Sequence, residues 1–268
     1  MNLTSNVKWI CDAFVTVLYP QACVICQRSV ESRALGVACE DCWRATRLFT
    51  ADEASCWKCG APLGGSEVYS NRAEVRCHQC DCFVFTAARA CGLYEKALRE
   101  VVLNLKRQPH VPEFVVNSLV NTASREPLNE STIVVPVPLH PQRLQMRGFN
   151  QASIIARAIS SSLQLPINEV SLKRTSHTEK YRAGLDAKGR SDTVEEAFAV
   201  VHPRSIVGEK ILLVDDVFTT GATAASCSTA LLGAGADTVN VLTIARTKRR
   251  TRETLWTRKQ QLRLKNMV

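Results

Sequence analysis

The segment best suited to chemistry is an apolar run that ends in two adjacent carboxylates and a threonine-rich loop. Residues 211–214 predict a buried strand, and Asp215 and Asp216 follow it directly. An alanine-rich helix is expected from about Ala224. Because an open parallel sheet exposes its ligand crevice at the carboxyl ends of its strands, this order places both carboxylates at such a crevice.

The short loop between the carboxylates and this helix is suited to hold a phosphate. Gly221 permits a turn that a Cβ atom would obstruct. Backbone N–H groups of the loop and of the helix start converge there, together with the hydroxyls of Thr219, Thr220 and Thr223. Carboxylates repel phosphate, so the two Asp residues suit ribose hydroxyls or a hydrated Mg²⁺. The implied ligand is a 5-phosphorylated ribose, and an ordinary strand, turn and helix is the alternative.

This segment resembles the phosphoribosylpyrophosphate (PRPP) motif of type I phosphoribosyltransferases. In that family two acidic residues contact the ribose hydroxyls, and a Thr-Thr-Gly-x-Thr loop holds the 5-phosphate. The resemblance implies a ribose contact from Asp215 and Asp216, and a site that binds PRPP together with Mg²⁺. The phosphate contacts that it implies come from Thr219, Thr220, Gly221, Ala222 and Thr223.

Four Cys-x-x-Cys pairs occupy the first third of the chain. Two residues between thiolates let a tight turn present both sulfurs to one ion, and two such turns complete a tetrahedron. Even pairing in a chain without an evident secretory signal favours metal over disulfides, and a redox dithiol would need only one pair. We expect two structural Zn²⁺ sites from sequential pairs, with an interleaved arrangement as the alternative and Cys82 or His78 as substitute ligands. The sequential sets are Cys23, Cys26, Cys39 and Cys42, and Cys56, Cys59, Cys77 and Cys80.

Length and hydropathy bound the organisation of the chain. Its 268 residues have room for one ordinary domain and a small second one. The apolar face over 1–19 is no evident secretory signal, since charges interrupt it and no cleavage site follows. Its helical spacing predicts an amphipathic helix packed on the protein, with a helix lying on a membrane as the alternative. No run of about eighteen apolar residues occurs, so we expect no membrane span and a cytoplasmic location. The expected parts are this helix, a zinc-binding module over 20–83, an α/β domain over 84–246 and a basic tail over 247–268.

Positive charge is concentrated at the carboxyl end. The formal net charge is +9, and residues 246–268 hold nine Lys and Arg against one Glu. Such a cluster favours contact with nucleic acid, for which Trp256 is a candidate stacking platform. A solvated terminal helix is the alternative.

The middle of the chain predicts a basic loop near the crevice. Arg143 and Arg147 fall in a flexible loop over 140–151 that can close over a pyrophosphate, because guanidinium groups suit bidentate oxyanion contacts. Lys106 is a further candidate for that role, and a solvated surface loop is the alternative. The expected elements around it are helices over 94–107, 152–163 and 224–236, strands over 133–137, 210–214 and 239–245, and a polar basic stretch over 173–193.

Five motifs combine in this chain: the Cys-rich amino end, Leu105-Lys-Arg107, Val135-Pro-Val-Pro-Leu-His140, Arg147-Gly-Phe-Asn-Gln151 and the Asp215-Asp216 loop. Together they resemble the ComF family, which includes the ComFC and GntX proteins, from about Leu18 to Arg246. The resemblance implies a type I phosphoribosyltransferase-like α/β domain with a parallel sheet behind an N-terminal Cys-rich zinc module. It also implies a part in natural competence, in handling imported single-stranded DNA and in contacts with competence proteins. Arg182 and Thr193 depart from the family, which usually has Gln and Asn at those places.

Two functions are compatible with these features. The first is a ComF-type protein that handles single-stranded DNA and carries a PRPP–Mg²⁺ site. The alternative is an active phosphoribosyltransferase with an unknown acceptor, in which Lys106 or Arg147 stabilises the leaving pyrophosphate. The sequence reveals neither a general base nor the nucleobase-reading segments of salvage enzymes, which disfavours base salvage. A PRPP-sensing regulator would need a DNA-reading helix, and none is recognised in the sequence.

Overall fold

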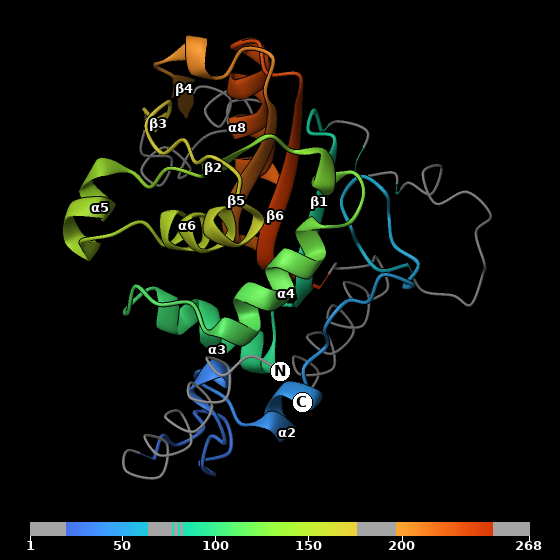
Figure 1. Cartoon of the computed structure of the whole chain (residues 1–268), viewed down its shortest axis with the longest axis vertical. Helices are drawn as coiled ribbons and strands as arrows, with labels where there is room; N and C mark the ends of the chain where they lie inside the picture. Colours follow the sequence, from blue (N-terminus) through green and yellow to red (C-terminus); the bar gives the residue numbers. More distant parts are fainter. Residues whose placement is uncertain (1–19, 64–76, 78–79, 81–82, 176–196, 249–268) are drawn as a thin grey trace, which may run out of the picture.

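A four-stranded parallel sheet forms the centre of the protein (Figure 1). The computed structural model describes residues 20–63, 77, 80, 83–175 and 197–248. Within them the strand order is β1-β6-β5-β2, and each neighbouring pair runs parallel. The α/β class expected from the sequence is confirmed. The strands are β1 (Ala87–Leu93), β6 (Thr238–Arg246), β5 (Lys210–Phe218) and β2 (Ile133–Pro136).

Helices cover both faces of this sheet, because its central strands are apolar on both sides. Leu212 and Val214 of β5 lie in a core shared with α3, α4 and α6. Ile211 and Leu213 lie in a second core, shared with α8 and with the antiparallel pair β3 and β4. These elements are α3 (Lys96–Leu105), α4 (Glu113–Ala123), α6 (Gln151–Leu163), α8 (Ala222–Gly233), β3 (Leu172–Arg174) and β4 (Phe198–Val200).

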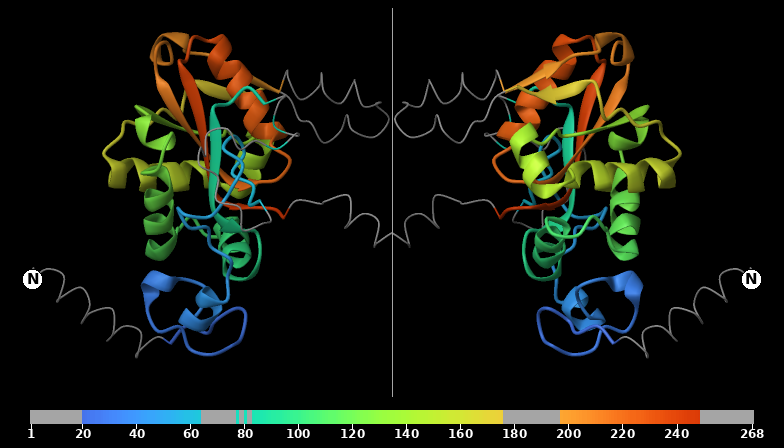
Figure 2. Two further views of the ribbon diagram at one scale, coloured as in Figure 1. Left: turned by 90° about the vertical axis from the view of Figure 1, so that its right-hand side faces the viewer. Right: turned by 90° about the vertical axis from the view of Figure 1, so that its left-hand side faces the viewer.

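The Cys-rich segment is divided between these two cores. Its first part contains η1 (Arg33–Leu35) and α2 (Glu40–Arg44), and it packs Trp43 into the core beside α3 and α4. Its second part packs Cys59 into the core that α8 shares. Figure 2 shows the first part, in blue, at the opposite end of the molecule from α8 and the small sheet.

The chain that leads into the second part also covers the outer edge of β1. The amide of Phe49 donates to the carbonyl of Cys91 at 2.8 Å, and the amide of Ala88 donates to the carbonyl of Lys58 at 2.7 Å. An open sheet edge invites pairing with other chains, so this cover satisfies the edge and protects it.

The prediction of a flexible basic loop over 140–151 is wrong, because most of this segment is helical. Pro141–Arg147 form α5. Proline suits the first position of a helix, and the ring of His140 caps this end by accepting from the amide of Gln142 at 3.2 Å. Gly148 adopts a φ of 81° and ends the helix. The basic side chains are therefore presented on a short helix.

Two other element boundaries differ from those expected. β5 extends to Phe218 instead of ending at Val214, since β6 continues beside it as far as Arg246. The helix expected over 224–236 spans Ala222–Gly233. It therefore begins inside the threonine-rich loop, which brings its first amides closer to the carboxylates.

Several predictions fall on residues outside the described ranges. The boundaries of the four expected parts stay predictions. None of the described helices is long and apolar enough to cross a membrane. The undescribed predictions are the helix over 1–19, the substitute ligands His78 and Cys82, most of the basic stretch with Arg182 and Thr193, and most of the basic tail with Trp256.

Candidate phosphoribose site and metal centres

The candidate site opens where β5 continues past the end of its neighbour β2. The pairing of these strands ends at Val214, opposite Pro136. Proline has no N–H to donate to a ladder, so Pro136 and Pro138 end β2 here. β5 continues beside β6 to Phe218. The two carboxylates lie directly after this step, at the carboxyl end of the sheet, where an α/β protein places its ligand.

Asp216 points to the face of the sheet that α3 and α6 cover. Gln151, the first residue of α6, donates from Nε2 to Oδ2 of Asp216 at 3.3 Å. Its Oε1 accepts from Arg147 at 2.6 Å, and Nζ of Lys106 lies 3.9 Å from the same Oδ2. The structure thus gathers two of the three predicted pyrophosphate residues around Asp216. The third, Arg143, lies on α5 before Arg147.

Gln151 was missed as a site residue, although it closes the Arg147-Gly-Phe-Asn-Gln151 motif. Gln151 is only 8% exposed. A buried amide must find hydrogen-bond partners, and here those partners join α5 to β5. In the sequence, Gln151 is a single polar residue at the start of a helix. Such a residue is equally compatible with an exposed position, so the pattern does not mark it as part of a site.

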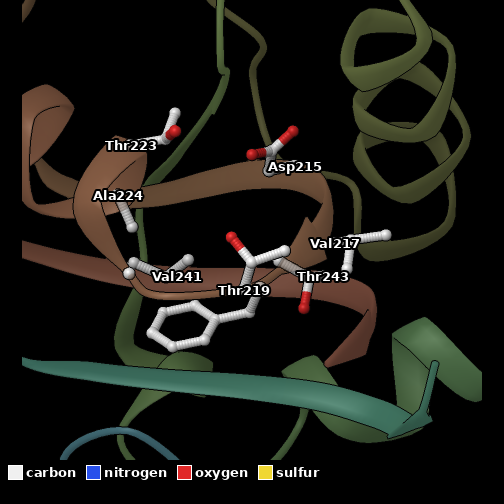
Figure 3. Close-up of a pocket in the computed structure, with 9 residues that line it drawn as sticks. Asp215, Val217, Thr219, Thr223, Ala224, Val241 and Thr243 are labelled. Atoms are coloured by element: carbon white, nitrogen blue, oxygen red, sulfur yellow. The ribbon is translucent and has the colours of Figure 1, made fainter. Parts of the chain in front are cut away.

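Asp215 points to the other face of the sheet, into a pocket at the start of α8 (Figure 3). We call residues 219–223, which the sequence predicts to hold a phosphate, the phosphate loop. Thr219, Gly221 and Thr223 of this loop line the pocket together with Asp215. The other lining residues are Val217, Phe218, Ala224, Val241 and Thr243. One of the two predicted acids and three of the five predicted phosphate residues thus meet in one place.

The remaining loop residues, Thr220 and Ala222, are not among the described residues that line the pocket. The amide of Ala222 lies 3.4 Å from Oγ1 of Thr220, so the hydroxyl is directed back to the helix start. Thr220 is exposed. Both residues therefore shape the turn in this structure, while their neighbours face the pocket.

Gly221 is required by the geometry of the phosphate loop. It precedes the first residue of α8 and has a φ of 85°. A Cβ atom there would lie 2.8 Å from Cζ of Phe83 and 2.9 Å from Cζ of Phe218. Only glycine meets both the conformation and the close approach. The turn therefore delivers the first amides of α8, and the positive end of its dipole, to the pocket.

Asp215 differs from an ordinary surface carboxylate because of its surroundings. Burial, followed by the negative charge of Asp216, raises the pKa of Asp215 to about 7. The amide of Asp216 and the cations Lys106 and Arg174 act in the opposite direction. A carboxyl group that is poised near neutrality gains charge readily when a cation arrives. The carboxylate and hydroxyl oxygens of this pocket are ligands that suit a hydrated Mg²⁺.

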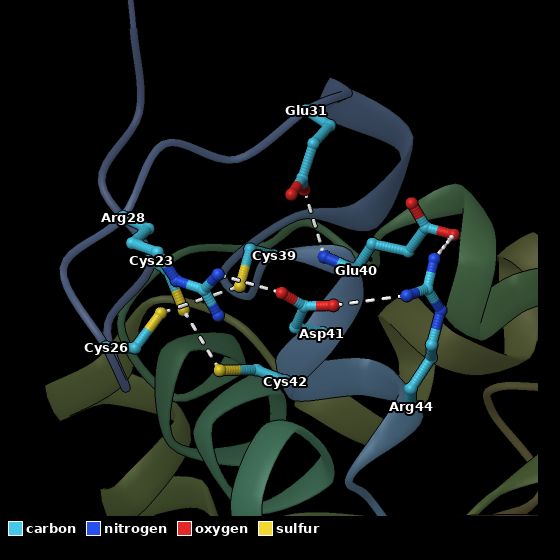
Figure 4. A network of polar contacts seen from close by, with 9 residues as sticks. All are labelled: Cys23, Cys26, Arg28, Glu31, Cys39, Glu40, Asp41, Cys42 and Arg44. Carbon is cyan, nitrogen blue, oxygen red and sulfur yellow. Dashed lines mark hydrogen bonds and ion pairs between the residues drawn. The ribbon is translucent and has the colours of Figure 1, made fainter.

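The first metal centre, which we call the first cluster, is formed by Cys23, Cys26, Cys39 and Cys42 (Figure 4). Sγ of Cys23 lies 3.7 Å from Sγ of Cys42, and Sγ of Cys26 lies 3.5 Å from Sγ of Cys39. All four sulfurs lie within 4.8 Å of one another. Zn–S bonds of about 2.3 Å in a tetrahedron separate the sulfurs by about 3.8 Å, so this donor set fits zinc.

The second cluster is formed by Cys56, Cys59, Cys77 and Cys80. Sγ of Cys56 lies 3.7 Å from Sγ of Cys80, and Sγ of Cys59 lies 3.8 Å from Sγ of Cys77. The Sγ atoms of Cys77 and Cys80 are closer, at 2.8 Å. The first two distances fit the same ion, whereas Cys77 and Cys80 would have to separate by about 1 Å to reach the tetrahedral spacing. The structure brings the four pairs together in sequential order.

The two clusters have different charged neighbours. At the first cluster, the amide and then the guanidinium of Arg28 lower the pKa of Cys26 to about 6, which favours the thiolate. Arg28 also pairs with Asp41 at 2.8 Å, and both side chains are at least half exposed. At the second cluster, Arg246 is 4% exposed and donates to the carbonyl of Cys59. Its guanidinium lies 3.9 Å from Sγ of the same cysteine.

Residues 14–81 match the family model of the double zinc ribbon domain. This match agrees with the two sets of four sulfurs and supports two Cys₄ zinc-binding sites. Together with the parallel sheet it defines the class of protein. The chain is an α/β protein with a parallel sheet and an N-terminal double zinc ribbon.

Relatives of this chain carry names that refer to competence and to DNA. Competence protein F of Haemophilus influenzae is 36% identical over 114 residues, which are 42% of this chain and about half (49%) of that protein. DNA utilization protein YhgH of Escherichia coli K12 is 27% identical over 234 residues, 85% of this chain and 98% of that protein. Competence protein ComFC of Bacillus subtilis is 24% identical over 225 residues, 76% of this chain and 89% of that protein. The resemblance to the ComF family is thereby confirmed.

Solved structures of similar fold include an amidotransferase and a phosphoribosyltransferase. The glutamine PRPP amidotransferase of B. subtilis covers 53% of this chain and 30% of its own, at a TM-score of 0.37 and 17% identity. A purine phosphoribosyltransferase of Pyrococcus horikoshii covers 51% of this chain and 82% of its own, at a TM-score of 0.32 and 15% identity. These scores describe a distant likeness of fold, and nothing about the ligand follows from them.

Proposed function

We propose that this chain acts in the uptake and handling of imported single-stranded DNA, as a ComF-type cytoplasmic protein with a PRPP–Mg²⁺ site. The observation that carries the ligand is the pocket that joins Asp215 to the phosphate loop at the start of α8. The DNA part is supported by the names of the relatives, a competence protein and a DNA utilization protein. A formal net charge of +9 agrees with a polyanionic partner. Competence proteins are the expected protein partners.

The phosphate and the ribose are held by different groups in this proposal. The first amides of α8 and the loop hydroxyls bind the 5-phosphate, because both offer donors to an anion. The carboxylates accept hydrogen bonds from the ribose hydroxyls. The phosphate group of residues is Thr219, Thr220, Gly221, Ala222 and Thr223, and the ribose group is Asp215 and Asp216.

In this proposal the pyrophosphate binds on the α6 side of β5. Lys106 and Arg147 lie around Asp216 there, and Arg143 is on the same helix as Arg147. Gln151 orients the Arg147 guanidinium through its 2.6 Å hydrogen bond. Bound Mg²⁺ would supply positive charge to the pyrophosphate oxygens. The zinc sites are structural, because four protein sulfurs leave no open coordination position.

Calorimetric titration of PRPP with Mg²⁺ into the zinc-loaded full chain tests the site. The variant Asp215→Asn/Asp216→Asn should weaken binding by at least about tenfold, since hydrogen bonds to two charged carboxylates are replaced by weaker ones to neutral amides. Asp237→Asn is the matched control, because Asp237 is an exposed carboxylate near β6. Equal affinity in all three proteins, or no binding by the wild type, would exclude the site.

The alternative function is an active phosphoribosyltransferase with an unknown acceptor. It is favoured by one observation, the gathering of Lys106 and Arg147 beside the carboxylates, where they could stabilise a leaving pyrophosphate. Release of pyrophosphate from PRPP in the presence of single-stranded DNA or nucleotide acceptors would establish it. Binding without release would leave the DNA-handling protein as the function.

DNA binding is tested by its dependence on salt. Fluorescence anisotropy with a labelled single strand should show affinity that falls steeply as salt rises, because phosphate neutralisation releases counterions. Deleting residues 249–268 should flatten the slope of log K against log salt by roughly 0.7 for each phosphate that the tail neutralises. The deletion starts at 249 because the amide of Thr247 donates to the carbonyl of Phe218 at 3.0 Å, beside the phosphate loop. Salt-independent binding would count against the proposal.

A further inference from the structure

A group of three aromatic rings joins the second cluster to the phosphate loop. The amide of Phe83 donates to the carbonyl of Cys80 at 3.1 Å, so this residue is tied to a metal ligand. Its ring stacks on Phe85 with centroids 4.9 Å apart and meets Phe218 edge-on at 6.5 Å. Phe85 meets Phe218 edge-on at 6.0 Å. Phe218 directly precedes the phosphate loop, so the rings connect a zinc ligand to the loop.

The ring of Phe83 also contacts the backbone of the phosphate loop. An ideal Cβ on Gly221 would lie 2.8 Å from Cζ and 3.2 Å from Cε1 of Phe83. Ring and glycine are therefore in close contact, and Gly221 is the residue from which α8 starts. The direction of the first amides of α8 depends on where this ring lies.

Arg246 makes a second connection between the same two places. Its guanidinium lies 5.4 Å from the ring centroid of Phe218, on which it makes a cation–π contact. It also donates to the carbonyl of Cys59 and lies 3.9 Å from the Sγ of that ligand. A buried cation is stable only when it is paired, and four thiolates around one Zn²⁺ carry a net negative charge. Metal at the second cluster therefore holds Arg246 in place.

Among the described residues, no such series of ring contacts leads from the first cluster to the phosphate loop. The first cluster's aromatic neighbour Trp43 meets Phe114 of α4, with centroids 4.5 Å apart. These rings lie in the core beside α3 and α4, and the phosphate loop adjoins the other core. The two clusters thus have the same type of ligands but lie beside different residues.

We propose that the second cluster is a positioning device for the phosphate loop. With metal bound, Phe83 and Arg246 hold Phe218 and Gly221 so that the α8 amides converge on the pocket. Affinity for PRPP therefore depends on the second cluster and not on the first. The choice of PRPP as ligand rests on the function proposed above, whereas the order of the loop does not.

The test compares Phe83→Ala with Phe114→Ala in the zinc-loaded full chain. Both variants remove one partly buried phenyl ring beside a cluster and leave all eight Cys ligands in place. Zinc content and Tm are measured first, so that loss of metal or of global fold is recognised. Hydrogen–deuterium exchange of peptides covering 218–224 then reports the order of the loop, and calorimetry reports affinity for PRPP with Mg²⁺.

We expect Phe83→Ala to speed exchange in 218–224 and to weaken PRPP binding by roughly tenfold or more, because small displacements at a binding site are costly. Phe114→Ala should leave both within about twofold, although its Tm falls by a similar amount. Arg246→Met, which keeps the length of the side chain, should act like Phe83→Ala. Equal exchange at 218–224 in the wild type and both Phe variants would overturn the proposal.

The exchange measurement also separates this inference from the function. If wild-type protein fails to bind PRPP but loop exchange still responds to Phe83→Ala and not to Phe114→Ala, the positioning role stands and the ligand is wrong. If wild-type protein binds PRPP but both variants bind equally well, the ligand stands and the positioning role is wrong.

Discussion

The two Cys₄ clusters have the same ligands and the same Cys-x-x-Cys spacing, but they serve different neighbours. The first cluster lies at one end of the molecule, in the core beside α3 and α4, and its charged neighbours form exposed ion pairs (Figure 4). The second cluster lies beside the edge strand β1 and the phosphate loop, with a buried guanidinium against one of its ligands. The same metal motif is therefore packed against α3 and α4 in one case and beside the candidate site in the other.

The largest expected difference in unfolding free energy comes from removing one Cys ligand from each cluster in turn. Cys80→Ser should lower the free energy of unfolding of the α/β domain by roughly 5 kcal/mol, because metal binding there is coupled to the core that α8 shares. Cys23→Ser, equally buried in the first cluster, should unfold its own segment and affect that domain much less. Urea unfolding followed by circular dichroism, with zinc content measured in parallel, checks this. Equal losses would show that the clusters are equivalent.

A smaller difference should separate the two arginines beside the clusters. Arg246→Met removes a buried cation paired with the second cluster and should cost about 3 to 5 kcal/mol of unfolding free energy. Arg28→Met removes an exposed cation, whose ion pair with Asp41 is screened by water, and should not change stability measurably. Denaturant titrations of both variants at low and high salt provide the measurement. A salt-sensitive loss in Arg28→Met would contradict the comparison.

Two glycines test the contact between Phe83 and the phosphate loop. Gly148 and Gly221 have φ values of 81° and 85°, but only at Gly221 would a Cβ meet neighbouring atoms within 4 Å. Gly148→Ala should therefore cost about 1 kcal/mol for backbone strain alone. Gly221→Ala should cost roughly 2 to 4 kcal/mol, since a ring must also move. Thermal unfolding of the two variants gives the difference, and equal costs would show that the ring yields freely.

The smallest effect concerns Asp215, which lies on the second cluster's side of the sheet. Its pKa of about 7 lies above the usual value, so the folded protein binds this proton more tightly than the unfolded chain. The contribution to stability is therefore fully present below about pH 4 and is lost as pH rises through 7. Asp215→Asn should raise the free energy of unfolding by about 1 to 3 kcal/mol at pH 8 relative to the wild type, but not at pH 4.

Denaturant unfolding at the two pH values checks this prediction. Asp237→Asn serves as the control, because it removes an exposed carboxylate and reports the effect of losing one negative charge. A parallel change in the control would show that net charge, and not the pocket, causes the effect. Better stability together with weaker PRPP binding would identify Asp215 as a residue kept for function.

Local chemistry was sufficient to predict the parts of the site. The apolar run before Asp215 and the glycine after the threonines specify strand, turn and helix through nearest neighbours, whatever the rest of the chain does. Spacing within each Cys-x-x-Cys pair likewise acts over a single turn. The segment over 140–151 was mispredicted as a loop, although Pro141 and Gly148 are local signals that start and end a short helix.

The sequence by itself determined which residues could bind phosphate and metal, because those capacities depend on side-chain chemistry and on spacing along a few residues. Only the tertiary structure decided which of them meet. β5 extends to Phe218 because β6 lies beside it, and Gln151 joins Arg147 to Asp216 across two elements. The contacts of Phe83 with Gly221 and of Arg246 with Cys59 join residues far apart in the chain. Such contacts follow from packing two cores around one sheet, and no local pattern encodes them.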